Sequence, residues 1–436
     1  MKKLIKPLVG LLVIAAIGLA AAALAITRST HSSVTALRQE ITKKGDPLYF
    51  ADFQPQSIDG GSNGYFHLMN AKEEILTFSD FLMEGFNGES EVNFNDPKKL
   101  SKSAVERLVT GVEIHKQLFE QLERMAACEQ FQADLDYTDG MFVSLPHLNL
   151  FTSIADSLQA KTVADVSQQR GDEAIRNCIS GMRIARLLMN EPILVSFLVA
   201  IALERTMLDS AFYVISSTPT SAESRVELAL EIATSAYGSG VVRVLKGERS
   251  CGIQTFKDLR EGKKDLLEGT DASNLIPGFG FERAYLNDDE SKYIEFMNAM
   301  IASAAESHGE RVRVFAEINQ EIEDSGFRFM VTKLILPGIL AVTEVVDQIE
   351  VKARCLQVIL RLQGEGEVAL EDLPEDPFSG KPLLAKQTEQ GWTVYSVGVN
   401  QQDDEGGLGT PDENWRQTPD IGYGPVLASP FGEDES

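Results

Sequence analysis

The segment Gly171–Asn190, GDEAIRNCISGMRIARLLMN, decides the fold class of this chain. Its apolar side chains recur at spacings of three and four residues, which places them on one face of an α-helix. They belong to Ala174, Ile175, Cys178, Ile179, Met182, Ala185, Leu188 and Met189. Residues 153–169 also favour a helix, and the turn 170–172 joins the two segments. The pair predicts a helix hairpin, after which Pro192 predicts a new helix beginning at Ile193.

The helical pattern continues through residues 65–363, where prolines are few. We therefore expect an irregular helical bundle or a stack of helix hairpins. The hairpin is about the size of a tetratricopeptide unit, but no second copy follows at a fixed period, which disfavours a repeat array. Ser103 and Thr220 are each followed three residues later by a Glu, which predicts helix starts with capping boxes. The polar, glycine-containing stretch 261–290 predicts a loop.

Residues 7–26, PLVGLLVIAAIGLAAAALAI, contain no polar side chain. At about 1.5 Å per residue, a helix of this length spans the roughly 30 Å hydrocarbon core of a bilayer. Three lysines precede it and only Arg28 follows closely, so the positive-inside rule keeps the N-terminus in the cytoplasm. The prediction is a single-pass anchor in the bacterial inner membrane, with the bulk of the chain in the periplasm. The alternative is a secreted protein cleaved near Ala25, because residues 23–25 have the small-x-small form of a signal-peptidase site.

Composition changes towards the C-terminus, where residues 371–436 hold seven of the sixteen prolines. Within this tail, the alternating segment 392–397 follows a Gln-Gly turn and predicts a small β-hairpin over residues 383–397. The acidic, glycine-rich stretch 398–415 follows. Clustered carboxylates in such a loop suit a hard cation such as Ca²⁺, whereas a solvated acidic loop is the simpler interpretation.

These elements give four regions. They are an anchor at 1–30, a linker at 31–64, the helical body at 65–363 and a tail at 364–436. The fold class is mainly α, with a transmembrane helix at one end and a β-hairpin with an acidic loop at the other. Two further apolar runs, at 193–203 and 329–343, are too short or too interrupted to span a bilayer and predict buried helices.

The tail resembles the C-terminal end of the major pseudopilin of type II secretion systems. The resemblance rests on LPEDPF at 373–378, GWTVYSVG at 391–398 and GTPDENW at 409–415. In that family a short hairpin leads into an acidic loop that binds calcium. The resemblance implies structural Ca²⁺ here, with a candidate ligand set comprising Ser396, Asn400, Asp403, Asp404, Asp412 and Glu413.

A wider stretch of the chain resembles a family of uncharacterised single-pass bacterial envelope proteins, which share an anchor, a helical body and this terminal module. The motifs are LPHL at 145–148, RGD at 170–172, RIARLL at 183–188, EPILVS at 191–196 and DDEGG at 403–407. This resemblance implies the architecture and transfers no activity.

No catalytic motif is recognisable in the helical body. None of the five histidines forms a metal or nucleophile motif, and the four cysteines contain no Cys-x-x-Cys pair. If the chain is exported, an oxidising compartment allows one or two disulfides, but the sequence does not choose among three pairings, and Cys178 fits a buried free thiol equally well. The sequence therefore favours a binding or scaffolding protein of the envelope, which is more consistent with a non-enzyme. The alternatives are an envelope hydrolase with a dispersed carboxylate site and an accessory protein of a secretion or pilus-like system.

The net charge of −25 excludes one class of partner. Nucleic-acid binding needs a basic face, and the sequence contains no block rich in Lys and Arg. The expected partners are the lipid bilayer, through residues 7–26, and an unidentified envelope protein.

Overall fold

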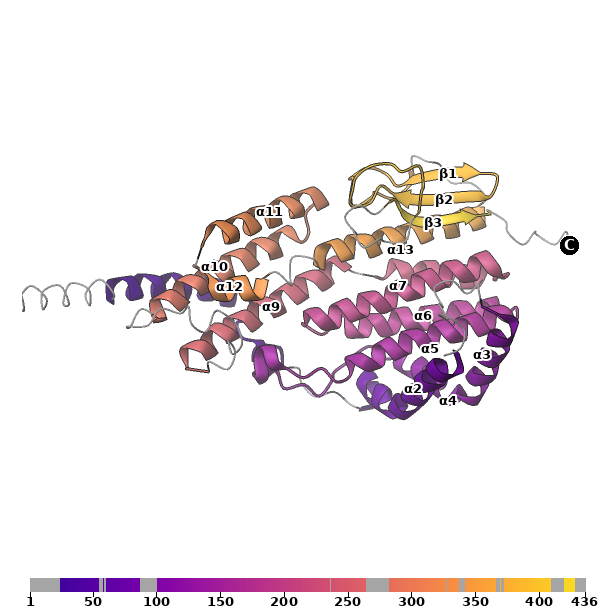
Figure 1. Cartoon of the computed structure of the whole chain (residues 1–436), viewed down its shortest axis with the longest axis horizontal. Coiled ribbons are helices and arrows are strands. Elements are labelled where there is room, and N and C mark those ends of the chain that lie inside the picture. The colour runs from indigo at the N-terminus through magenta and orange to yellow at the C-terminus, as the bar shows by residue number, and fades with distance from the viewer. Residues whose placement is uncertain are drawn as a thin grey trace, which may run out of the picture.

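The computed structural model describes residues 24–54, 58, 60–86, 100–235, 237–263, 282–326, 328–336, 342–365, 369, 372–408 and 419–427. This part of the chain is mainly helical and ends in a small antiparallel sheet (Figure 1). The first helices after the N-terminal one are α2 (Gly64–Phe86), α3 (Lys102–Ile114), α4 (Lys116–Ala126), α5 (Leu148–Ser167), α6 (Gly171–Leu188) and α7 (Leu194–Ser217). The others are α8 (Ala222–Ala233), α9 (Tyr237–Arg260), α10 (Glu282–Ser303), α11 (His308–Asp324), α12 (Met330–Ile335) and α13 (Val342–Glu365).

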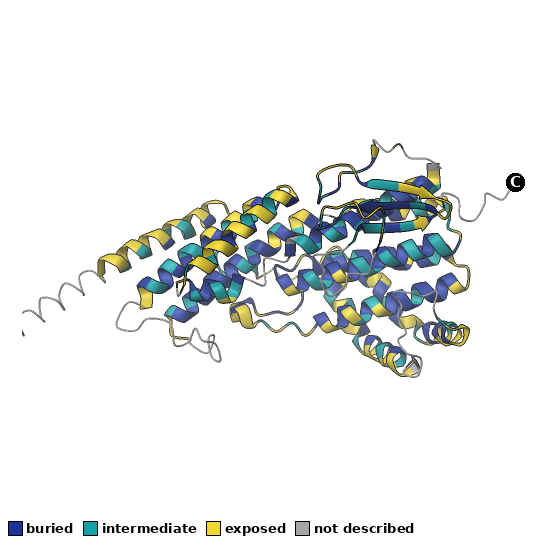
Figure 2. Cartoon of the chain, turned by 45° about the horizontal axis from the view of Figure 1, so that its top comes forward, coloured by how far each residue is buried: buried dark blue, intermediate teal, exposed yellow. Residues whose placement is uncertain are grey.

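The predicted helix hairpin is confirmed as α5 and α6, and it forms the centre of the body. α6 packs between α5 and α7, and these helices are the most deeply buried part of the molecule (Figure 2). A Cβ atom at Gly181 of α6 would lie 2.4 Å from the sulfur of Met207 in α7, so a glycine there lets the two helices approach closely. The helix predicted to follow Pro192 is also confirmed, with Ile193 at the N-cap of α7.

Two local predictions need correction. The caps of α3 and α8 are Ser101 and Ser221, whose hydroxyls accept backbone N–H bonds, and not Ser103 and Thr220. Ser101 and Ser221 are followed three residues later by Ala104 and Ser224, so the true caps lack the glutamate of the capping box and the motif pointed to neighbouring residues. The predicted loop at 261–290 is too long, because α10 is already helical from Glu282; residues 264–281 lie outside the described residues.

The N-terminal helix, residues 24–43, lies at one end of the molecule and is exposed over most of its surface (Figure 2). Val34 and Ile41 are buried against the body, and the Arg38 guanidinium donates bonds of 2.7 and 2.8 Å to the buried Glu290 of α10. Thus part of the expected linker, 31–64, is a helix fastened to the body. Most of the expected membrane segment lies outside the described residues, and no described helix is sufficiently long and apolar to cross a bilayer.

The C-terminal sheet has the order β1 (Leu384–Thr388), β2 (Gly391–Ser396), β3 (Ile421–Val426). The first two strands confirm the predicted hairpin, with Leu384 opposite Tyr395, and β3 adds an antiparallel strand that the sequence did not predict. The sheet lies over α13 (Figure 1).

The sheet is fixed to the body through Tyr423 of β3. Its hydroxyl donates a 2.6 Å bond to Asp209 of α7, its ring stacks on Phe212, and Lys352 of α13 also binds Asp209 at 2.5 Å. These contacts join the tail to α7 and α13, so the terminal module is part of the same folded unit as the body.

Candidate functional site

The predicted ligand loop folds back onto the sheet, and its polar groups are largely engaged with one another. Asp403 accepts a 3.1 Å bond from the Tyr395 hydroxyl and a 2.8 Å bond from the backbone N–H of Glu405. The Asn400 amide donates to the Asp404 carboxylate at 3.1 Å. Asn400, Asp403 and Asp404 therefore lie together on one loop.

Asp420, which the sequence analysis missed, closes this loop. It lies just before β3 and accepts backbone N–H bonds from Asp404 at 3.3 Å and Gly406 at 2.8 Å. Burial raises the pKa of Asp420, and the nearby carboxylates of Asp403 and Asp404 raise it further. Burial, together with Asp403, also raises the pKa of Tyr395 to about 12. Negative charge is thus concentrated here, which is the electrostatic condition under which a cation binds.

Ser396 stands apart from that group. Its buried hydroxyl donates a 2.7 Å bond to Asp376 and accepts a 2.9 Å bond from the backbone N–H of Gly398, which ties the start of the tail to β2. Asp412 and Glu413 lie outside the described residues. Within the described part of the chain, no group of three or more His, Cys, Asp or Glu side chains is arranged to hold a metal ion.

The motifs LPHL and EPILVS meet in a buried polar cluster. The Glu191 carboxylate accepts a 2.6 Å bond from the Ser196 hydroxyl and a 3.2 Å bond from Nε2 of His147. All three side chains are buried. The carboxylate stands between the other two groups, so the serine contacts the glutamate and not the histidine, and the order differs from that of a nucleophilic triad. The cluster joins the start of α5 to the start of α7 and is a structural tie.

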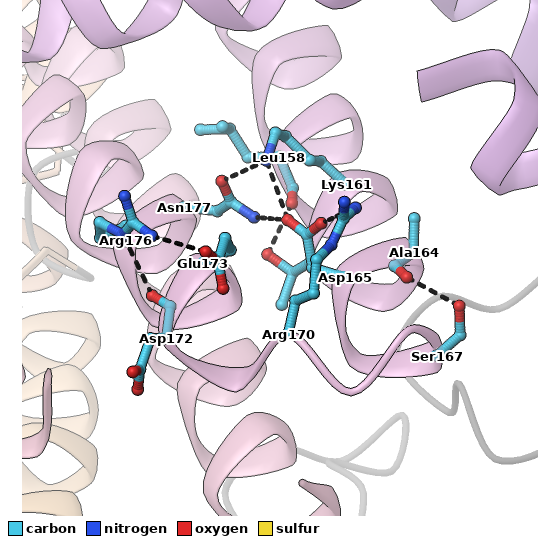
Figure 3. Close-up of polar contacts among 11 residues, drawn as sticks. Leu158, Lys161, Ala164, Asp165, Ser167, Arg170, Asp172, Glu173, Arg176 and Asn177 are labelled. Atoms are coloured by element: carbon cyan, nitrogen blue, oxygen red, sulfur yellow. Dashed lines mark hydrogen bonds and ion pairs between the residues drawn. The ribbon is translucent and has the colours of Figure 1, made fainter. Parts of the chain in front are cut away.

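The residues of the RGD motif, 170–172, also take part in contacts between helices, at the α5–α6 turn. Asp165 of α5 is buried and accepts 2.8 Å bonds from Lys161 and from Asn177 of α6, together with a bond from Arg170 (Figure 3). Asp172 accepts a 2.8 Å bond from the backbone N–H of Ser221, before α8. These bonds join α5 to α6 and the start of α6 to the segment before α8.

The four cysteines are all unpaired in this structure. Cys178 and Cys355 are buried, and burial raises the pKa of the Cys178 thiol to about 12. A thiol in this state carries almost no reactive thiolate near neutral pH.

A different feature is a row of exposed apolar side chains on α2. Four large apolar side chains project from the side of this helix opposite its buried face. They are Phe66, 47% exposed, Met69, 41%, Leu76, 42%, and Met83, 60%. We call this stripe the α2 face. Scattered exposed apolar residues are ordinary, whereas several aligned along one helix are typical of an interaction surface. The sequence spacing could have revealed it, because residues 69, 76 and 83 are seven apart.

Comparisons with known proteins found no relative. No protein-family model matches this chain, and neither the curated proteins nor the solved structures contain a match.

Proposed function

We propose that this chain is a binding or scaffolding protein of the bacterial envelope, anchored in the inner membrane with its body in the periplasm. The α2 face is the observation that carries this proposal. Burying an apolar side chain contributes about 1.5–3 kcal/mol, so side chains of this size exposed along 23 helical residues favour association.

The N-terminal helix supports the membrane part of the proposal. It follows directly on the apolar segment 7–26 and is held to the body by Arg38 and Glu290. An anchor joined to the body in this way would hold the body close to the membrane. We expect the protein to stay in the membrane fraction when the membranes are extracted with carbonate. We also expect added protease to digest the body only after the outer membrane has been opened.

Site-specific photo-crosslinking in intact cells tests the binding role. A photoreactive amino acid replaces Leu76 or Met83 on the α2 face, and the control replaces Leu230 of α8, which is 64% exposed. We expect a discrete protein adduct from both α2 positions and none from the control. Absence of adducts from both α2 positions would overturn the proposal.

We propose in addition that Ca²⁺ stabilises the terminal module. The support is the resemblance to the pseudopilin tail and the concentration of charge around Asp403, Asp404 and Asp420. The resemblance adds Asp412 and Glu413, which lie outside the described residues, to these candidate ligands. The ion would hold the loop in place and supply no chemistry.

Thermal unfolding with and without Ca²⁺ tests this second proposal. A ligand present at 100 times its Kd stabilises the folded state by about 2.7 kcal/mol, so the melting temperature should rise measurably with millimolar Ca²⁺. The rise should vanish in Asp403→Ala/Asp412→Ala and persist in Glu173→Ala, which removes a carboxylate from the surface of α6. An unchanged rise in the double variant would exclude this site.

A further inference from the structure

The α2 face, together with the exposed Glu73 and Asp80, has the spacing of a coiled-coil seam. Positions 66, 69, 73, 76, 80 and 83 are separated alternately by three and four residues, as are the a and d positions of a heptad, and the exposed polar residues 70, 77 and 84 lie beside them at the e positions. The d positions are all apolar: Met69, Leu76 and Met83. Over three heptads, therefore, one helix presents a complete apolar row to the outside.

The residues at the a positions indicate which charge a partner helix would need. They hold Phe66, Glu73 and Asp80, so two of the three are exposed carboxylates. A helix packed along the seam would bring its own side chains against these acids. Charges at seam positions select the partner, because a like charge opposite them is repelled and an opposite charge is attracted.

This charge pattern disfavours the other occupants. A second copy of α2 would bring four carboxylates into one seam, whether the helices were parallel or antiparallel. An anionic lipid surface would be repelled by the same acids. A helix with apolar residues at its d positions and Lys or Arg at its a positions satisfies both parts of the pattern.

We propose that the α2 face binds a basic amphipathic helix of another envelope protein, with its lysines or arginines against Glu73 and Asp80. This inference rests on the proposed binding function and specifies the chemistry of the partner. The methionines at two d positions suit such a surface, since their flexible side chains adapt to different apolar partners.

The test uses two synthetic helical peptides of three heptads with leucine at every d position. One carries lysine at the a positions and the other carries glutamate. Fluorescence anisotropy measures the binding of each labelled peptide to the detergent-solubilised full chain. The lysine peptide should bind at least tenfold more tightly than the glutamate peptide, and this preference should shrink as salt is raised.

Three variants locate the binding. Met69→Asp/Leu76→Asp should weaken lysine-peptide binding at least tenfold. The matched control Val226→Asp/Leu230→Asp, which changes two exposed apolar residues of α8, should leave it unchanged. Glu73→Lys/Asp80→Lys should invert the preference, so that the glutamate peptide binds more tightly. This variant keeps the apolar row and changes only exposed charges, and circular dichroism confirms that it is folded.

Equal affinity for the two peptides, or equal loss in the α2 and α8 variants, would overturn the inference. Dimerisation of the wild-type chain that Met69→Asp/Leu76→Asp abolishes would also overturn it, in favour of a second copy. A failure of peptide selectivity while crosslinking from the α2 face persists would refute only the basic-helix partner. Loss of crosslinking as well would refute the binding function itself.

Discussion

Replacing Glu191 with alanine tests whether the buried cluster of His147, Glu191 and Ser196 is a structural tie. The substitution removes the acceptor for the Ser196 hydroxyl at 2.6 Å and for His147 Nε2 at 3.2 Å. A hydrogen bond to a charged group contributes about 1.5–3 kcal/mol, and both donors remain buried without this acceptor. We therefore expect the free energy of unfolding to fall by about 3–5 kcal/mol, the range measured when one member of a buried pair is removed.

Urea unfolding followed by circular dichroism measures this loss. Ser196→Ala alone should cost less, about 1.5–3 kcal/mol, because only one bond to the carboxylate disappears. In Glu191→Ala/His147→Ala the two effects should fall short of additivity by about 1 kcal/mol or more, since the two side chains share one contact. Glu173→Ala, which breaks an exposed ion pair on α6, should cost less than about 1 kcal/mol. A loss below about 1 kcal/mol for Glu191→Ala, or strict additivity in the double variant, would refute the structural interpretation.

Three further predictions concern packing, pH and the terminal module. Gly247→Ala should lower the free energy of unfolding by about 1–3 kcal/mol, because the added Cβ would lie 1.9 Å from the backbone oxygen of Pro192. Gly238→Ala in the same helix places its Cβ with no atom within 4 Å and should raise the free energy of unfolding by up to about 1 kcal/mol, so equal urea midpoints for the two variants would contradict the prediction. Burial raises the pKa of Asp289 from 3.8 to about 6, so the folded state binds this proton more tightly; the stability of the wild type relative to Asp289→Asn should fall by roughly 3 kcal/mol as the pH rises from about 3 to 7, and a pH-independent difference would be the opposing result. Tyr423→Phe removes the 2.6 Å bond to Asp209 and should increase hydrogen exchange in the C-terminal sheet while leaving α5 and α6 protected; unchanged exchange in the sheet would show that the bond is unimportant.

The helical body was predictable because its signal is local. The apolar stripe of 174–189 repeats within a single element, and the turn residues beside it mark where the element begins. The hairpin of β1 and β2 was predictable for the same reason, since its two strands are adjacent in sequence.

β3 and the polar clusters were not predictable from local patterns. Ile421–Val426 contains two glycines and a proline, which argue against a strand, and its pairing depends on β2, about thirty residues earlier. The contact between His147 and Glu191 joins residues 44 positions apart, and Asp420, just before β3, contacts the acidic loop from 14 to 16 positions away. Local spacing does not predict contacts between residues so far apart in sequence. The motifs therefore included His147 and Glu191 but did not show that the two residues are in contact.

Under the proposed membrane anchoring, the helix at 24–43 would set the height of the body above the bilayer. If the hydrocarbon region ends at Ile26, as proposed, the first side chain buried against the body is Val34. The intervening helical residues rise about 1.5 Å each, which gives a clearance of roughly 10 Å between the acyl chains and the body. The polar headgroup layer on one side of a bilayer is about 5–8 Å thick. The body would therefore stand just clear of the lipid headgroups, with its distance from the membrane fixed by the length of a continuous helix.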